Sequence, residues 1–118
     1  MADYLPKYLE GDSLTFIAGT GGVTGGLLVN VAGAVATAGD CVVGVAGQDA
    51  AVGAPCTVWR DGVHRLRTAA AVTAGQPLKA AAAGTVVPYV STDAANLYIG
   101  DAWTDAASGA LVDAILRF

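Results

Sequence analysis

The side chains able to do covalent or acid–base chemistry are few in this 118-residue chain. The single histidine, His64, stands in the run GVHRLR beside positive charge, and no motif pairs it with a nucleophile. Nucleophilic catalysis needs an activated hydroxyl or thiol next to a base. We therefore interpret His64 as a surface or interface residue and expect no catalytic residue.

Two aspartates, Asp49 and Asp105, are the candidates for paired-carboxylate chemistry. Each stands in a DAA stretch between an apolar run and a glycine, where an aspartate commonly accepts hydrogen bonds from backbone amides. This context favours a turn role for both. The stretch GTGGVTGG (19–26) has the composition of a phosphate loop but lacks the G-K-[ST] ending, and we interpret it as a flexible hairpin loop.

Metal and cofactor sites are not expected. One histidine and two cysteines, Cys41 and Cys56, without CxxC or HxxxH spacing do not make a tetrahedral metal site. Each cysteine begins an apolar run, which favours a reduced, buried thiol that acts as a small hydrophobic group. A disulfide between the two is the alternative, and the distance between their Cα atoms decides it.

Turn-forming residues recur at short intervals and leave little room for helices. Clusters of Gly, Asp and Pro separate apolar runs of about four to eight residues, which is the spacing of an all-β sandwich or barrel. The expected strands are LTFIA, LLVNV, CVVGV, CTVW, VHRLR, TVVPYV, LYIG and LVDAILRF. Asp61-Gly62 predicts a tight type I′ hairpin between CTVW and VHRLR. Short helices are expected at most in KAAAAG and TDAANL.

The last run, 111–118, tests the strand assignment, because its alanines and leucines also suit an amphipathic helix. As a strand it has one apolar face and one mixed face. The apolar face consists of Val112, Ala114, Leu116 and Phe118, and the mixed face of Leu111, Asp113, Ile115 and Arg117. A barrel wall with a partner outside needs this pattern, and we predict a strand.

A duplicated phrase indicates how the strands are organised. Six residues recur with identical spacing 56 positions later: Gly44, Asp49, Ala50, Ala51, Gly53 and Ala54 return as Gly100, Asp105, Ala106, Ala107, Gly109 and Ala110. A weaker echo relates AVATAGDCVV to AAVTAGQPL around T-A-G turns. We predict a small β-barrel or sandwich of two related hairpin units that pair into one closed sheet and so hide their edges. The excursion at 79–96 is expected to be a surface loop with a separate contact role.

Composition limits the size of the core and the kinds of partner. The hydrophobic fraction is 54%, but aromatic residues supply only 7%, and there are 25 alanines and 16 glycines. A single domain of residues 11–118 with such small side chains gains little from burial, so association with identical copies would help it. A net charge of −4 with six Lys and Arg argues against nucleic acid as a partner. No apolar run approaches the roughly 20 residues of a membrane span, and no export signal is expected.

Two parts of the chain are candidate contact surfaces. The N-terminal arm, residues 1–10, has large apolar or amphipathic side chains around a proline that favours extended structure, and it reaches on the order of 30 to 35 Å. The alternative is that this arm packs across its own barrel. The middle third holds most of the cations, which form either a solvated strand face or a patch that meets an acidic protein surface. The subunit-interface hypothesis names Trp59, Arg65, Arg67 and Trp103.

The order of these segments resembles the bacteriophage capsid cement, or head decoration, proteins. The resemblance runs from Gly11 to Phe118 through GDSLTFIA, GGVTGGLLV, AVATAGDCVVGVAGQDAAVGAPCTVWRDGVHRL, AAVTAGQPL and YIGDAWTDAASGALVDAILRF. Its specificity lies in the ordered set of segments and not in any single motif. Trp103, the two cysteines and the aromatic arm depart from the pattern of that family.

The resemblance implies a non-enzymatic virion protein, made in the host cytoplasm, that binds the outer capsid surface, commonly as a homotrimer. It would stabilise the joints between subunits of the major capsid protein. The residues expected to contact the capsid or a neighbouring subunit are Tyr4, Leu5, Pro6, Tyr8 and Leu9. Two alternatives are a phage tail or baseplate structural β domain and a small carbohydrate-binding β module. The aromatic candidates for a sugar site are Trp59, Tyr89, Tyr98 and Trp103.

Overall fold

The computed structural model describes residues 13–117, and these fold almost entirely as β-structure. The strands are β1 (Ser13–Ile17), β2 (Leu28–Asn30), β3 (Val42–Ala46), β4 (Pro55–Trp59), β5 (Gly62–Arg67), β6 (Pro77–Ala80), β7 (Val86–Pro88), β8 (Tyr98–Ala102) and β9 (Leu111–Leu116). Two single-turn 3-10 helices, η1 (Ala82–Gly84) and η2 (Ala95–Leu97), lie in the two segments where short helices were expected. The all-β prediction is confirmed.

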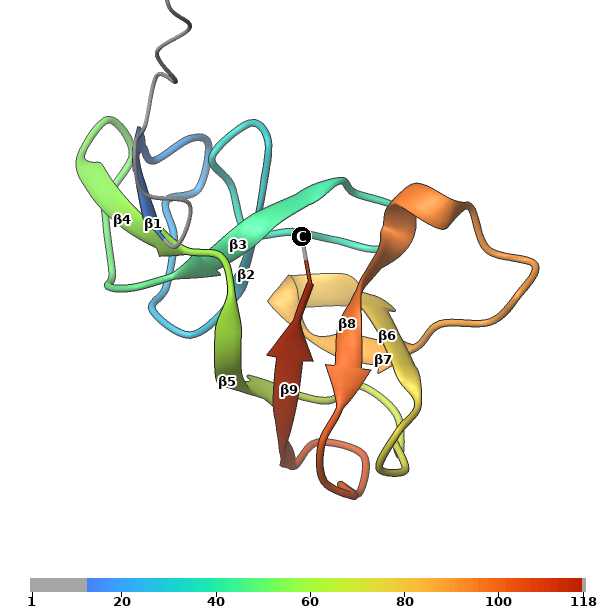
Figure 1. The fold of residues 1–118 in the computed structure, drawn as a ribbon. Coiled ribbons are helices and arrows are strands. Elements are labelled where there is room, and N and C mark those ends of the chain that lie inside the picture. The colour runs from blue at the N-terminus through green and yellow to red at the C-terminus, as the bar shows by residue number, and fades with distance from the viewer. Residues whose placement is uncertain (1–12, 118) are drawn as a thin grey trace, which may run out of the picture.

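The strands form two antiparallel sheets (Figure 1). The four-stranded sheet has the order β1-β4-β3-β2, and the five-stranded sheet has the order β5-β9-β8-β6-β7. A parallel bridge between Thr68 and Val86 joins the chain after β5 to β7 and curls the larger sheet toward a barrel. The prediction of one closed sheet is therefore wrong, because each repeat builds a sheet of its own.

The sequence duplication is a structural duplication. The hairpin β3–β4 recurs 56 positions later as β8–β9, with the same bounds except that β9 is one residue longer than β4. In the first unit β3 pairs with β2, and the register shifts after Val29; in the second unit β8 pairs with β6, and the register shifts after Leu78. A shared bulge means that the two units agree in detail as well as in strand order. The prediction of two related hairpin units is confirmed.

Strand β6 was missed by the sequence interpretation, which placed a turn and a short helix there. Lys79 and Ala80 have low strand propensity, and the first residue is Pro77, which is tolerated because the first position of a strand can lack an N–H donor. The counterpart of β6 is β2, and the isolated bridges Val23–Ala50 and Val72–Ala106 stand at equivalent places. The T-A-G turn at 73–75, which leads into β6, therefore corresponds to residues 24–26 before β2 and not to the T-A-G at 37–39, so the weaker echo was a wrong match.

The hairpin predicted at Asp61-Gly62 is also wrong. Strand β4 lies between β1 and β3, whereas β5 pairs with β9 in the other sheet. Gly62 does adopt a positive φ of 105°, so the dipeptide marks a sharp turn that passes the chain from one sheet to the other. Likewise 19–26 joins β1 to β2, which are not neighbours, so it is not a hairpin loop.

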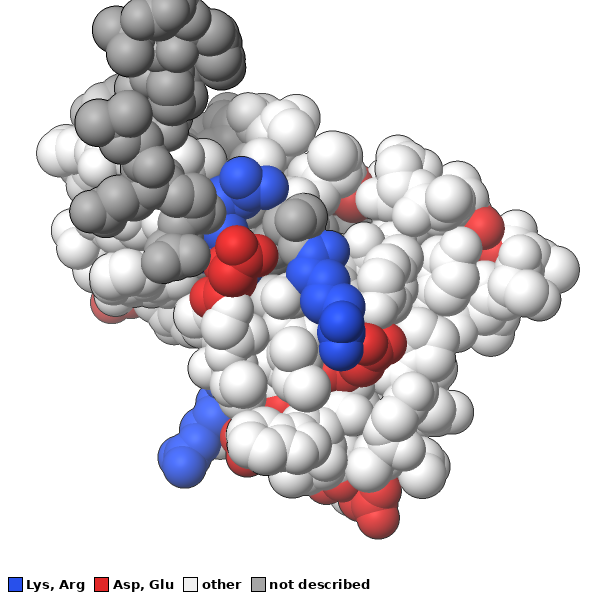
Figure 2. Space-filling view, in the orientation of Figure 1, with Lys and Arg blue, Asp and Glu red and all other residues white. Residues whose placement is uncertain are grey.

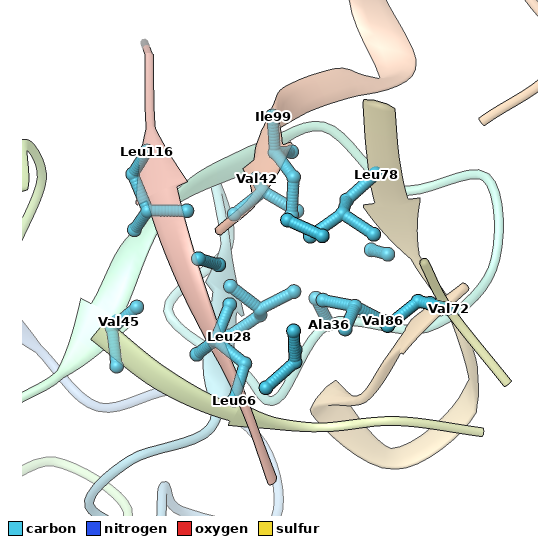
Figure 3. Packing of buried hydrophobic residues seen from close by; sticks show 14 residues of the cluster. Leu28, Ala36, Val42, Val45, Leu66, Val72, Leu78, Val86, Ile99 and Leu116 are labelled. Carbon is cyan, nitrogen blue, oxygen red and sulfur yellow. The ribbon is translucent and has the colours of Figure 1, made fainter. Parts of the chain in front are cut away.

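The larger hydrophobic core lies between the two units (Figure 3). The first unit contributes Leu28, Ala36, Val42 and Val45, and the second contributes Leu66, Val72, Leu78, Ala80, Val86, Ile99, Ala102, Val112, Ala114 and Leu116. A smaller core inside the first unit consists of Ala18, Val23, Val29, Ala46 and Cys56, with Phe16, Val43 and Ala50 packed against it. Strand β3 is therefore apolar on both faces, and one of these faces covers the second unit.

Helix η1 of the second unit contacts the first unit through a backbone hydrogen bond and a close approach of the two chains. The N–H of Gly84 donates to the carbonyl oxygen of Ala36 at 2.8 Å. A Cβ atom at Gly84 would lie 2.8 Å from the Cβ of Leu27, and the φ of Gly84 is +74°. Glycine is required there because the two units approach too closely for a side chain.

Candidate interaction surfaces

The two aspartates considered for catalysis brace equivalent turns. Oδ1 of Asp49 accepts a hydrogen bond from the N–H of Gly25 at 2.8 Å, and Oδ1 of Asp105 accepts one from the N–H of Ala74 at 2.7 Å. Each carboxylate thus fixes the segment that leads into β2 or β6. The predicted turn role is confirmed.

His64, the single histidine, makes a local contact: its Nε2 lies 3.0 Å from the backbone carbonyl oxygen of Asp61.

The two cysteines differ in environment, and both are free thiols in this structure. Cys56 is buried in the core of the first unit, as predicted, whereas Cys41 is exposed just before β3, where the prediction was wrong. Within residues 13–117, no three metal-ligating side chains gather into a cluster. The described part of the chain also has no helix that is long and apolar enough to cross a membrane.

The five arm residues predicted to contact the capsid or a neighbour, which are Tyr4, Leu5, Pro6, Tyr8 and Leu9, lie outside the described residues. Their role stays a prediction. The division of the chain into an arm of residues 1–10 and a domain of residues 11–118 likewise stays a prediction.

The outer side of the five-stranded sheet carries the mixed face that the sequence predicted for the last strand. Val112, Ala114 and Leu116 are buried, and the alternate residues of β9 point to the other side of the sheet. Phe118, the fourth residue of the predicted apolar face, lies outside the described residues. Across β5 and β9 the register pairs Val63 with Ile115, Arg65 with Asp113, and Arg67 with Leu111. The first pair is apolar, the second joins opposite charges, and the third joins an arginine to a leucine. Trp103 follows the pair of Ala102 with Ala114, and its N–H donates to the carbonyl oxygen of Asp113 at 2.7 Å, so it stands level with Asp113. We call these six residues, with Trp103, the mixed face.

Exposure and hydrogen bonding show which parts of the mixed face are accessible. The side chain of Arg65 is 78% exposed, and its Nε is 3.7 Å from Oδ1 of Asp113, so the pair is loose. Arg67 donates to the carbonyl oxygen of Gly109 at 2.7 Å. Trp103 is 60% exposed. Figure 2 shows that charged side chains are scattered on the surface in view, with uncharged surface between them.

The equivalent face of the four-stranded sheet has no charged residue on β1 or β4. The register pairs Ser13 with Trp59, Thr15 with Thr57, and Ile17 with Pro55. The indole of Trp59 covers Gly47, where a Cβ atom would lie 2.7 Å from Nε1. The structure therefore brings Arg65, Arg67 and Trp103 to one face, whereas Trp59 belongs to the other sheet.

The excursion at 79–96, predicted to be a surface loop, is only partly one, because it contains η1 and the core strand β7. A polar network that the sequence interpretation missed holds its last part, residues 90–96, against the second unit. Nζ of Lys79 lies 2.8 Å from Oδ2 of Asp93, and both side chains are largely buried. The same carboxylate oxygen accepts from the N–H of Val90 at 2.9 Å. These hydrogen bonds, led by the one from Lys79, hold the pKa of Asp93 below its usual value. The partners lie on β6 and on a distant loop, so no local sequence signal marks them.

The two tyrosines considered for sugar binding belong to this same region. The rings of Tyr89 and Tyr98 pack edge to face with centroids 5.9 Å apart. The hydroxyl of Tyr98 donates to Oδ1 of Asp101 at 2.9 Å, and Nε of Arg117 lies 2.9 Å from Oδ2 of the same residue. Burial, followed by this hydrogen bond, raises the pKa of Tyr98. Both tyrosine side chains thus make contacts within the domain, and the described residues form no pocket in which the rings could line a sugar site.

Comparison with known proteins identifies the family of this chain and a solved structure with the same fold. The model of the phage cement protein family matches residues 9–117. The chain belongs to the phage cement protein family. Its fold is also that of a solved structure, the head fiber gp8.5 N base of bacteriophage phi29, at 23% identity and a TM-score of 0.67, covering 89% of this chain and 94% of that one. Among curated proteins, none matches the chain. Family membership gives the protein a capsid-associated structural role in a phage virion.

Proposed function

We propose that this cement protein acts without catalysis, binds the outer surface of the assembled capsid, and stabilises joints between subunits of the major capsid protein. The observation that carries the proposal is the family match across residues 9–117. Many weak contacts repeated over a closed shell add up to strong resistance against the pressure of packaged DNA. The protein would be made in the host cytoplasm and added to the capsid from outside.

The contacts would be divided among the surfaces described above. The arm residues, chiefly Tyr4, Leu5, Pro6 and Tyr8, with Leu9, dock onto capsid protein or onto an adjacent cement subunit. Arg65, Arg67 and Trp103 on the mixed face, together with Trp59 on the other sheet, supply contacts between copies in a homotrimer. Cyclic symmetry would let one such patch be used by every subunit. The small side chains of the core support this, because a domain that buries little apolar area gains from association.

The joint-stabilising role is tested with capsids of the encoding phage that lack this protein. Such capsids are heated or osmotically shocked with and without the purified chain, and the DNA that they release is measured. We expect the full chain to raise the temperature of release. The chain without residues 1–10 should protect less, and a Val52→Ser variant, changed at an exposed turn residue, should protect fully. Equal DNA release with and without the full chain would contradict the proposed role.

The oligomeric state is tested separately by the mass of the protein in solution and on the capsid. A mass of three chains of 11.7 kDa supports the homotrimer. A hexameric ring with no affinity for capsids would instead favour a tail or baseplate component.

A further inference from the structure

Strand β5 is an edge strand, and along residues 62–66 no strand of the described chain lies beside it on its outer side. It pairs with β9 on one side, and the strand order places nothing beyond it. The bridges that residues 62–66 form are those of the ladder with β9, whereas the C-terminal end of the edge, at Arg67 and Thr68, is closed by the parallel bridge to Val86 of β7. Figure 1 shows β5 at the outer limit of the larger sheet. An open edge of this kind is a template for an added strand.

The side chains along this edge are apolar and cationic. Val63 is 49% exposed, and Arg65 beside it is held only loosely by Asp113. Arg67 continues the row, and Leu111 next to it on β9 is 50% exposed. A strand that fits this edge would therefore place apolar side chains near Val63 and carboxylates near the two arginines.

The chain itself contains a segment of this character in the residues before Ser13. In DYLPKYLE, positions 3–10, Tyr4, Pro6 and Tyr8 alternate with Leu5 and Leu9, and the segment begins and ends with an acid. Proline is acceptable in an added strand because one side of such a strand needs no N–H donor. Glu10, and Asp12 just beyond the segment, stand two positions apart, which is the spacing of Arg65 and Arg67, so this end of the segment complements the charge of β5.

We propose that residues 3–10 of one copy add as a strand to the free edge of β5 in a neighbouring copy. The twelve residues before Ser13 reach on the order of 40 Å when extended, which is far enough to cross to a second subunit. The contact is heterologous: each copy gives one arm and receives one, so the exchange closes into a ring when the rotation between copies allows it. The inference depends on the self-association proposed above but not on capsid binding.

Mixed cross-linking tests the exchange in the absence of capsids. All copies carry Cys41→Ser, which leaves only the buried Cys56. One set of copies carries Tyr8→Cys, the other carries Val63→Cys, and a short thiol cross-linker is added to the mixture. We expect a covalent product of twice 11.7 kDa that contains one chain of each kind. In the matched control, Val31→Cys replaces Val63→Cys at another exposed valine and should give no such product.

A chain carrying both Tyr8→Cys and Val63→Cys distinguishes the two possible routes of the arm. A linked product that runs as a single chain would show that the arm covers its own edge, and would overturn the exchange. Absence of any product from the mixed copies would also overturn it. A second variant, Arg65→Glu with Arg67→Glu, should lower the yield of mixed product about tenfold, because it opposes the acidic arm with like charge. An unchanged yield would contradict the charge argument.

The outcome separates this inference from the proposed function. Cross-linked product without any protection of capsids leaves the arm exchange standing and refutes the cement role. Protection of capsids by copies that never cross-link refutes the exchange and keeps the cement role.

Discussion

The substitution Leu28→Ala tests whether the two units unfold as one. Leu28 lies on β2 of the first unit, yet its fully buried side chain belongs to the core between the units. Truncation of a buried leucine in a packed core costs about 3 to 5 kcal/mol, because the removed carbons leave a cavity that the neighbours fill only in part. The whole domain is expected to have a free energy of unfolding of about 5 to 15 kcal/mol. The change therefore removes a large share of the stability.

The assay uses the two tryptophans as separate reporters. Trp59 lies on β4 of the first unit, and Trp103 follows β8 of the second. With Trp59→Phe or Trp103→Phe as background, urea unfolding followed by fluorescence reports on one unit at a time. We expect both reporters to shift to lower urea together when Leu28 is truncated, since its side chain fills the core of the second unit from the first.

The matched control is the same chemical change at Leu111, which is 50% exposed on the mixed face. Leu111→Ala should cost about 1 kcal/mol or less, because a half-exposed side chain loses little burial. The reasoning is refuted if Leu28→Ala shifts only the Trp59 reporter, or if it costs no more than Leu111→Ala.

Three further outcomes follow from the structure. Gly100→Ala should destabilise by more than about 2 kcal/mol in urea unfolding, because a Cβ atom there would meet the carbonyl oxygen of Ile115 on β9; a cost under half of that contradicts the close approach. The lowered pKa of Asp93 means that its contribution to stability is complete above the ordinary value of 3.8 and is lost as the pH falls through the folded-state pKa. Replacement of Lys79 by Met should raise that pKa in an NMR titration, and an unshifted titration refutes the pairing. A thiol reagent should label Cys41 rapidly, one group per folded chain, and two rapidly labelled groups would contradict the buried second thiol.

Local patterns were sufficient to predict most strands and the duplication. Period-2 alternation placed the buried and mixed faces of β9 correctly, and identical spacing around Asp49 and Asp105 revealed two equivalent turns. These features depend on neighbouring residues, and a strand or a turn is largely decided by them.

The arrangement of the units was not predictable in the same way. The dipeptide Asp61-Gly62 signals a positive φ but does not say whether the strands that flank it pair, and here they lie in different sheets. One signal was available and overlooked: the run VVGVA of β3 is apolar at every position, which is typical of a strand buried on both faces. The ion pair of Lys79 with Asp93 was out of reach, because the two residues come together through tertiary contacts.

Co-sedimentation with capsids that lack this protein tests the central claim most directly. The purified chain is mixed with such capsids of the encoding phage, the capsids are pelleted, and the bound copies per capsid are counted. The cement role predicts saturable binding, with a copy number that is a multiple of three. A chain that stays in the supernatant at every concentration would contradict the claim that it is a cement protein of the outer capsid surface.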